Sequence, residues 1–363
     1  MRWDSIQNYW DSNSNILQFE VMPVSGNKEK EFLNYIHYSR GLAIMAIVAR
    51  HLIFPLEETN PGLYDFLLLI TGNSSILFVF ISGFLFEYLL PKYNYKQYLS
   101  KKVRFVILPY LIFSIPALIL YAFDLPWAQF NLESEIAGFG DYSLFHRLVM
   151  LLITGAHQWH FWFIPMITLI YLSAPILKFV DRNPLLYMVL PILIGVAVFM
   201  GRPTFAPLRS YLYFLPVYMM GMLASRYRGV MFEAMNKYKG IIWILFLFLI
   251  LTSWTYLRFR NFEWLYFQKI IGAFVLLKVM KEVSSKTVKW ALSLLAKYSF
   301  TIYFIHMYVH IFLRHLSITI GAYEKPDLLV FTVLVTLNLL ISIFLAHLAK
   351  YFLGSRSKSL LGV

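Results

Sequence analysis

The sequence of 363 residues contains no cysteine, and only 14% of its residues carry a charge. The first absence excludes disulfide bonds, thiolate metal sites and cysteine nucleophiles. The second excludes an ordinary soluble domain, in which about 25% of the residues are charged. Apolar residues take the place of the charges, since 59% of the chain is hydrophobic and 18% is aromatic. This composition predicts an all-α, polytopic membrane protein embedded in a lipid bilayer.

Apolar segments of roughly 17 to 25 residues, the length that crosses a bilayer as a helix, recur along the chain. We predict about ten such spans: 33–54, 72–90, 105–123, 159–177, 185–201, 211–225, 241–257, 264–280, 291–313 and 328–349. The apolar piece 144–156 is too short to span alone and is either re-entrant or an extension of the fourth span. These spans predict a polar N-terminal tail (1–31), a transmembrane domain (32–350) and a C-terminal tail (351–363).

Lysine and arginine concentrate in alternate loops. The basic residues on the richer side are Lys28, Lys30, Lys92, Lys96, Lys101, Lys102, Arg104, Lys178, Arg182, Arg226, Arg228, Lys237, Lys239, Lys281, Lys286, Lys289, Lys350, Arg356 and Lys358. The positive-inside rule places this side, and with it both termini, in the cytoplasm. Sorting across a membrane accounts for the net charge of +13, so we do not expect nucleic acid as a partner.

The first span carries two polar residues that are costly inside a membrane. Arg40 and His51 are eleven residues apart. On a helix both therefore point from one face, roughly 16 Å apart along the axis. The alternative is that the arginine reaches the headgroups and the histidine is merely hydrogen-bonded. In a functional site, His51 could act as a base or nucleophile, and Arg40 could bind a phosphate, a carboxylate or an oxyanion.

A basic stretch precedes the third span. Lys101 and Arg104 are three residues apart and share a helix face beside Lys102, at the predicted cytoplasmic edge. Such a group can bind phosphate, or it can simply anchor the helix on the cytoplasmic side. Lys269, near one end of the eighth span, is predicted to extend its ammonium group to the headgroups.

Two stretches further along the chain combine histidine with aromatic residues. His157 and His160 are three residues apart at the predicted outer interface, next to Trp162. No third ligand lies near them in the sequence, so we expect a pair of polar donors that faces a substrate and no metal site. Tyr303 and His306 share one face of the ninth span. They predict either a polar wall of a site or hydrogen bonds between helices.

Small residues in two spans predict close packing of helices. Gly83 in the second span and Gly221 in the sixth allow backbones to approach each other. The sixth span also contains Pro216 and is short for a membrane crossing. We expect these positions to serve packing and not chemistry.

The order of these elements resembles the acyltransferase-3 family of membrane acyltransferases, which includes O-acetylases of cell-envelope glycans. The matching elements are Arg40-x10-His51, Ser82-Gly83-Phe84-Leu85, the basic cluster leading to Pro109-Tyr110, His160-x-Trp162-Phe163, Tyr171-Leu172-Ser173-Ala174-Pro175, the Gly221 span, and Tyr298-Ser299 with Tyr303 and His306. The resemblance covers about residues 32–350. It implies transfer of an acyl group, usually acetyl, from acyl-coenzyme A to a hydroxyl of a glycan or lipid-linked sugar.

The resemblance also implies roles for particular residues. The family's Arg-x10-His pair falls on Arg40 and His51, which are then the catalytic residues. Its Arg-x-x-Arg element falls on Lys101 and Arg104, and the lysine lacks the forked donors of arginine. With Lys102, these cations are expected to bind acetyl-coenzyme A, the acyl donor. His51 would act as the general base or would carry the acyl group itself.

The remaining candidates are expected on the acceptor side of the same site. His160 and Trp162 would shape the acceptor site, with the tryptophan stacked on a sugar, while Tyr303 and His306 would donate or accept hydrogen bonds. We therefore predict a multi-pass O-acyltransferase of the inner membrane. The alternative is a transporter or flippase of a glycan precursor. Such a protein would also line its path with charges, but the chain lacks a matched pair of Gly/Pro-broken spans.

Overall fold

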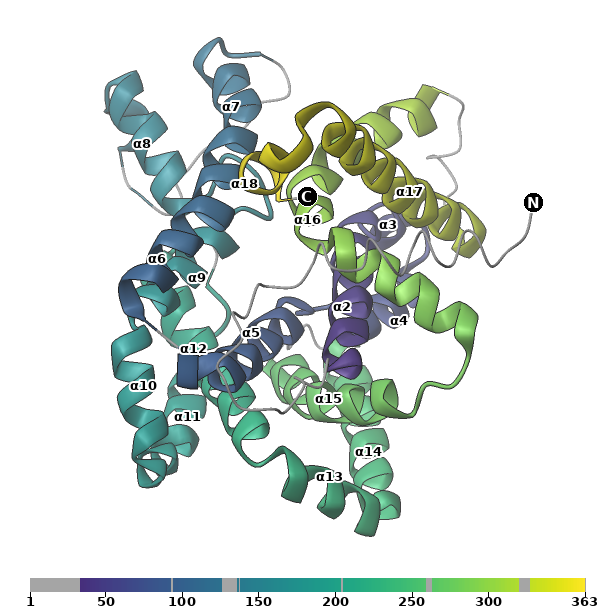
Figure 1. The fold of residues 1–363 in the computed structure, drawn as a ribbon. Helices are drawn as coiled ribbons and strands as arrows, with labels where there is room; N and C mark the ends of the chain where they lie inside the picture. The colour runs from purple at the N-terminus through teal and green to yellow at the C-terminus, as the bar shows by residue number, and fades with distance from the viewer. Residues whose placement is uncertain are drawn as a thin grey trace, which may run out of the picture. The chain divides into compact units, whose positions relative to one another are not determined.

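The computed structural model describes residues 33–92, 94–125, 136, 138–203, 205–258, 263–319 and 327–362. All regular structure in these residues is helical, which confirms the predicted all-α class (Figure 1). The chain divides after Asn34 into two units, and the helices described below belong to the second unit, Tyr35–Val363, apart from the first residue of α2. The predicted N-terminal tail, 1–31, lies outside the described residues.

Every predicted span contains a helix. In chain order these are α2 (Asn34–Leu52), α5 (Ser75–Leu89), α7 (Leu108–Ala122), α9 (Phe163–Leu172), α11 (Leu190–Met200), α12 (Pro207–Arg226), α14 (Lys239–Arg258), α15 (Glu263–Glu282), α16 (Lys286–Thr319) and α17 (Leu328–Leu353). The other α-helices in the described residues are α3 (Leu56–Thr59), α4 (Pro61–Thr71), α6 (Tyr95–Lys102), α8 (Leu144–Thr154), α10 (Ala174–Arg182), α13 (Arg228–Lys237) and α18 (Ser357–Leu361). Short segments of other helix types are also present in the described residues: η2 (Leu90–Lys92), the π-helical η3 (Val103–Ile107), η4 (Phe139–Asp141), η5 (Pro184–Val189) and η6 (Gly354–Arg356).

Several of these helices can cross a membrane. Among the described residues, three helical runs are long and apolar enough to do so: Pro61–Leu89, Tyr95–Ala122 and Leu328–Leu353. Two bent pairs, α9 with α10 and α13 with α14, raise the number to five if each pair is one span. The chain is therefore a multi-pass membrane protein. The count of about ten spans and the cytoplasmic position of the termini stay predictions.

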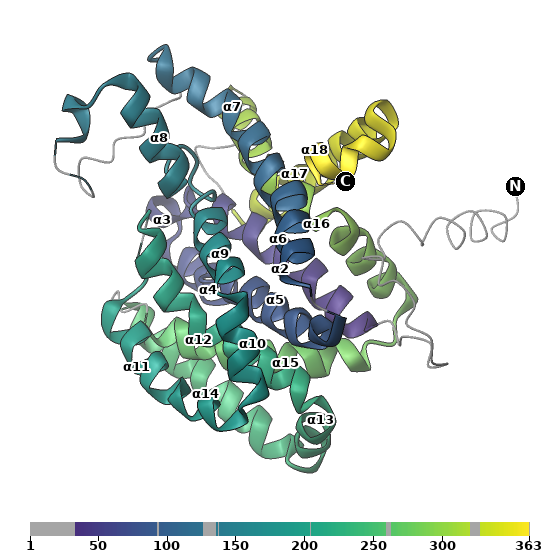
Figure 2. The same cartoon turned by 60° about the vertical axis from the view of Figure 1, so that its left-hand side comes forward.

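Helices α5 and α12 pack against each other in the interior (Figure 2). A Cβ atom on Gly83 or on Gly221 would lie 2.0 Å from a backbone oxygen of the other helix, of Tyr218 and Phe80 respectively. Only glycine allows this approach, so both residues serve packing as predicted. Pro216 lies inside α12, and the helix continues through it from Pro207 to Arg226.

The prediction for Lys269 is wrong. Its side chain is buried in α15, and its ammonium group donates hydrogen bonds to the carbonyl oxygens of Leu69 and Ile70, while Gln268 donates to Leu69 as well. These carbonyls lie at the end of α4, where a helix has no partners of its own for them. Lys269 therefore caps α4, a helix that lies between the first two predicted spans.

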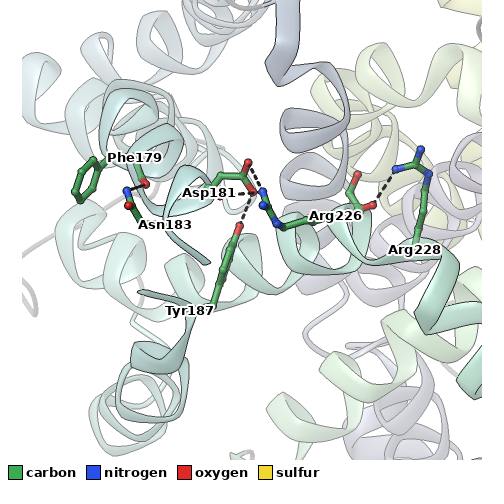
Figure 3. Close-up of polar contacts among 7 residues, drawn as sticks. Phe179, Asp181, Asn183, Tyr187, Arg226 and Arg228 are labelled. Atoms are coloured by element: carbon green, nitrogen blue, oxygen red, sulfur yellow. Dashed lines mark hydrogen bonds and ion pairs between the residues drawn. The ribbon is translucent and has the colours of Figure 1, made fainter. Parts of the chain in front are cut away.

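An ion pair joins α10 and η5 to α12 at the predicted cytoplasmic side (Figure 3). Arg226 Nη1 lies 3.0 Å from Asp181 Oδ2 and 2.9 Å from the carbonyl oxygen of the same residue. Tyr187 donates its hydroxyl to the other carboxylate oxygen at 3.1 Å. The buried Asp181 carboxylate in α10 thus binds Arg226 of α12 and Tyr187 of η5. These contacts fix the bent pair α9–α10 against α12.

Candidate active site

Helices α2 and α16 run in the same direction beside each other. Arg40 donates from Nη2 to the carbonyl oxygen of Ala296 at 2.8 Å, and the His51 ring centroid lies 5.3 Å from that of His306. The step from Arg40 to His51 along α2 is eleven residues, and the step between their partners Ala296 and His306 along α16 is ten residues, so the two helices are parallel. Arg40 and His51 therefore both face α16, as their spacing predicts.

Three imidazole rings from separate parts of the sequence meet at the far end of this pair. His51 comes from α2, His306 from α16, and His160 from the loop between α8 and α9. The His160 ring centroid lies 4.7 Å from that of His306 and 6.4 Å from that of His51. We call His51, His160 and His306 the histidine cluster. Sequence analysis selected all three residues, and the structure brings them together.

Some ring nitrogens of the histidine cluster make no hydrogen bond within the described residues. His306 Nδ1 lies 3.0 Å and 2.8 Å from the carbonyl oxygens of Ile302 and Tyr303, so this nitrogen carries the proton. In the neutral ring Nε2 then holds a lone pair, and it has no partner within the described residues. Neither ring nitrogen of His160 makes a hydrogen bond of ordinary geometry there, although the Phe304 backbone is near. Buried nitrogens without partners are costly, which suggests a site that a polar ligand completes.

The loop that carries His160 is held by specific contacts. Gly155 has a positive φ of 74°, and a Cβ atom there would lie 2.5 Å from the backbone of Phe161. Tyr303 donates its hydroxyl to the carbonyl oxygen of His160 at 2.6 Å. Tyr303 therefore positions His160, a role that sequence analysis did not assign to it. The hydrogen bond to a substrate that we predicted for Tyr303 stays a prediction.

His157 lies apart from the histidine cluster, and the predicted donor pair with His160 is wrong. Its Nδ1 lies 2.9 Å from the carbonyl oxygen of Leu151, and its Nε2 lies 2.7 Å from Ser114 Oγ. Both nitrogens are used to join α8 to α7. In the described part of the chain, no three His, Cys, Asp or Glu side chains have the arrangement of a metal site.

Two residues after His160, Trp162 is almost covered by its neighbours. Its ring stacks on Phe214, with centroids 5.5 Å apart and planes 24° apart, and the Arg202 guanidinium lies 5.3 Å from the ring centroid. Arg202 also lies close enough to His51 to interact with it electrostatically. Sequence analysis did not select Arg202, because a lone arginine in a short loop gives no signal. Trp162 is only 8% exposed, so little of its ring is available for the predicted stacking on a sugar.

The three predicted donor-binding cations have different surroundings. Lys101 and Arg104 are exposed. Lys102 is half-buried, and its ammonium group lies 4.2 Å from the ring centroid of Tyr171 and 5.2 Å from that of Tyr98. Lys102 therefore joins α6 to α9 through its aromatic neighbours. Lys101 and Arg104 stay accessible to a ligand.

Comparison with known proteins supports one family. No curated protein and no solved structure matches the chain. The family model Acyl_transf_3, described as an acyltransferase domain, matches residues 33–347. This range includes the histidine cluster, Arg40 and the basic stretch before α7, and it supports an acyltransferase activity but not the flippase alternative. Because the match covers most of its length, the chain belongs to the acyltransferase-3 family.

Proposed function

We propose that this chain is an O-acyltransferase of the inner membrane. It transfers an acyl group, most simply acetyl, from coenzyme A to a hydroxyl of a cell-surface glycan or lipid-linked sugar. The observation that carries the proposal is the histidine cluster at the far end of the α2–α16 pair, with Arg40 at the near end. Family membership supports the acyltransferase class.

Because Arg40 and His51 are far apart along α2, they must have different roles in the reaction. Eleven residues of helix correspond to roughly 16 Å, so one reacting carbonyl cannot contact both side chains. Arg40 therefore binds the donor, together with the exposed Lys101 and Arg104, and does not stabilise the oxyanion. The acyl-thioester end of the donor then extends along α2 to His51.

At His51 the acyl group is transferred from the thioester to the acceptor hydroxyl. The imidazole accepts the proton of the acceptor hydroxyl, and the hydroxyl oxygen attacks the thioester carbonyl carbon. As the carbon–sulfur bond breaks, the coenzyme A thiolate leaves and takes the proton back from the imidazolium. In the alternative sequence, His51 itself attacks the thioester and passes the acyl group to the acceptor in a second step.

The other cluster members assist from fixed positions. Neither ring nitrogen of His160 has a partner of ordinary geometry among the described residues, so its N–H can stabilise the oxyanion that forms on the carbonyl. His306 is held by two backbone carbonyls, and its ring packs beside the His51 ring with centroids 5.3 Å apart, so it limits the rotation of that ring. Arg202, whose guanidinium lies 5.3 Å from the centroid of the Trp162 ring, is our candidate for contact with the acceptor.

The test is to replace His51 with alanine in cells and to measure acetyl groups on surface glycans by mass spectrometry. We expect transfer to fall by about 10²–10⁴-fold, the usual contribution of a general base, with normal membrane insertion. His146→Ala is the matched control, because His146 is an exposed histidine on α8 with a serine partner. Wild-type acetylation in the His51→Ala cells would contradict the proposal.

The two chemical sequences are separated by a second measurement. Purified protein is incubated with acetyl-coenzyme A that carries a radiolabelled acetyl group, without acceptor, and the protein is then isolated. Label that stays on the wild type and is missing from His51→Ala identifies His51 as the acyl carrier. An unlabelled wild type that still acetylates a glycan acceptor identifies it as the base.

A further inference from the structure

The last described residues fold back onto the helical body. After α17 the chain turns through η6, and α18 packs against η3 and α7 (Figures 1 and 2). Thr301 in α16 donates its hydroxyl to the carbonyl oxygen of Leu361 at 3.1 Å, and Gly362 lies against the ring of Phe300. Ser357 is buried at the start of α18. The segment predicted as a C-terminal tail thus contains a helix with a defined position.

This position places a lysine of α18 beside an arginine of the donor-binding stretch. Lys358 and Arg104 share one aromatic ring, since the ammonium group lies 5.6 Å and the guanidinium carbon 5.4 Å from the centroid of Phe105. Both cations are exposed. Lys350, at the end of α17, lies close enough to Lys358 to repel it electrostatically. We call Arg104, Lys350 and Lys358 the C-terminal basic cluster.

The C-terminal basic cluster has no carboxylate partner among the described residues. The fold therefore brings together like charges from η3, α17 and α18, which repel one another until an anion binds. Phosphate groups are the anions that suit such a cluster, because each can accept several charge-assisted hydrogen bonds.

The cluster also leads toward the active site. Lys350 lies near Lys297 of α16. Ala296, the residue before Lys297, accepts the hydrogen bond from Arg40. Lys297 thus lies between the C-terminal basic cluster and the backbone position on α16 that binds Arg40, from which α2 leads to His51. Coenzyme A carries a diphosphate and a separate 3′-phosphate, so its several anionic groups match a series of separate cations.

We propose that α18, docked in this position, completes the donor site: Lys350 and Lys358, together with Arg104, bind the phosphate groups of coenzyme A. The proposal rests on the proposed function and adds the C-terminal helix to it. The match to the family model ends at residue 347, before the two lysines, so family membership does not assign them this role.

The experiment measures binding of coenzyme A and of 3′-dephospho-coenzyme A to the full chain in phosphatidylcholine nanodiscs. The wild type is expected to bind coenzyme A more tightly. Lys350→Gln with Lys358→Gln should weaken coenzyme A binding by about tenfold per lysine and reduce its advantage over the dephospho form. Lys286→Gln is the matched control, since Lys286 is an exposed lysine on the same predicted side. It should bind as the wild type does.

A second variant tests the helix and not its charge. Thr301→Val removes the hydrogen bond to Leu361 and keeps every cation, so it should weaken coenzyme A binding in the same direction by a smaller factor. Unchanged coenzyme A affinity in the double lysine variant would overturn this proposal and leave the proposed function intact. A wild type that fails to bind coenzyme A would overturn both. An effect of the lysines that appears only with phosphatidylglycerol in the nanodiscs would assign them to lipid headgroups instead, and would also overturn the proposal.

Discussion

Two helix crossings in this chain are built in the same way and have different consequences. Where α5 crosses α12, a Cβ atom on Gly221 would lie 2.0 Å from the carbonyl oxygen of Phe80. Where α2 passes α16, a Cβ atom on Gly41 would lie 2.2 Å from the carbonyl oxygen of Leu292. In both places a glycine lets one helix approach the backbone of the other.

The surroundings of the two crossings differ. Fully buried apolar side chains, including Phe84 and Val217, flank the α5–α12 crossing. Beside Gly41, in contrast, α2 presents Arg40 and then His51 to α16. The same packing device therefore supports the fold at one crossing and sets the spacing of the proposed active site at the other. Substitutions at the two glycines should have separable effects.

The largest expected effect is on folding at the α5–α12 crossing. Gly221→Ala places a methyl group onto a backbone oxygen that cannot move without moving α5, so we expect a loss of about 3 kcal/mol of stability. Thermal unfolding in detergent, followed by size-exclusion chromatography, measures it. Gly195→Ala in α11 is the control, because a Cβ atom there has no described neighbour within 4 Å. Equal stability of the two variants would show that the crossing is not tightly packed.

Gly41→Ala should instead reduce activity more than stability. The new methyl group forces α2 away from α16, and a shift of about 1 Å at a reacting group can cost 10²-fold in rate. We expect transfer to fall by about 10- to 100-fold, with a smaller change in unfolding temperature than in Gly221→Ala. Acetyl transfer and thermal unfolding measured on the same preparation separate the two effects. A variant that loses stability but keeps the wild-type rate per folded molecule would break the comparison.

Tyr303→Phe tests the loop that carries His160. The substitution removes only the hydroxyl that donates to the His160 carbonyl oxygen, so the loss of stability should be about 1 kcal/mol. Because His160 is then less well positioned, the rate of transfer should fall by about tenfold, a smaller factor than for Gly41→Ala. If Tyr303 has only a structural role, the maximal rate of the folded enzyme will not change.

The helices were predictable from the sequence to a larger extent than the contacts of single polar residues. Runs of apolar residues located a helix in each predicted span, and the spacing of Arg40 and His51 predicted their common face. His157 and His160 show the limit of prediction from the sequence, because nothing in their spacing indicates which of the two belongs to the active site. In the structure His157 joins α7 to α8, whereas His160 reaches the histidine cluster. Which of the two histidines has both ring nitrogens hydrogen-bonded depends on a partner that is distant in sequence, here Ser114.

Lys269 and Arg202 show the same limit in other ways. Lys269 lies near the end of an apolar span, which favours a position at the headgroups. It is buried because the end of α4, almost 200 residues earlier, offers free carbonyl groups. Arg202 gives no sequence signal, and its place beside Trp162 follows from the packing of α12 against α9.

The central claim is that three histidines distant in sequence act as one catalytic unit. The direct test is a double-mutant cycle with His51→Ala, His306→Ala and the combined variant, in which acetyl transfer from acetyl-coenzyme A is measured per folded molecule. Residues that act as a unit are strongly non-additive, so the double variant should be about as slow as His51→Ala alone. Losses that multiply, or a His306→Ala variant with the wild-type rate, would contradict the claim.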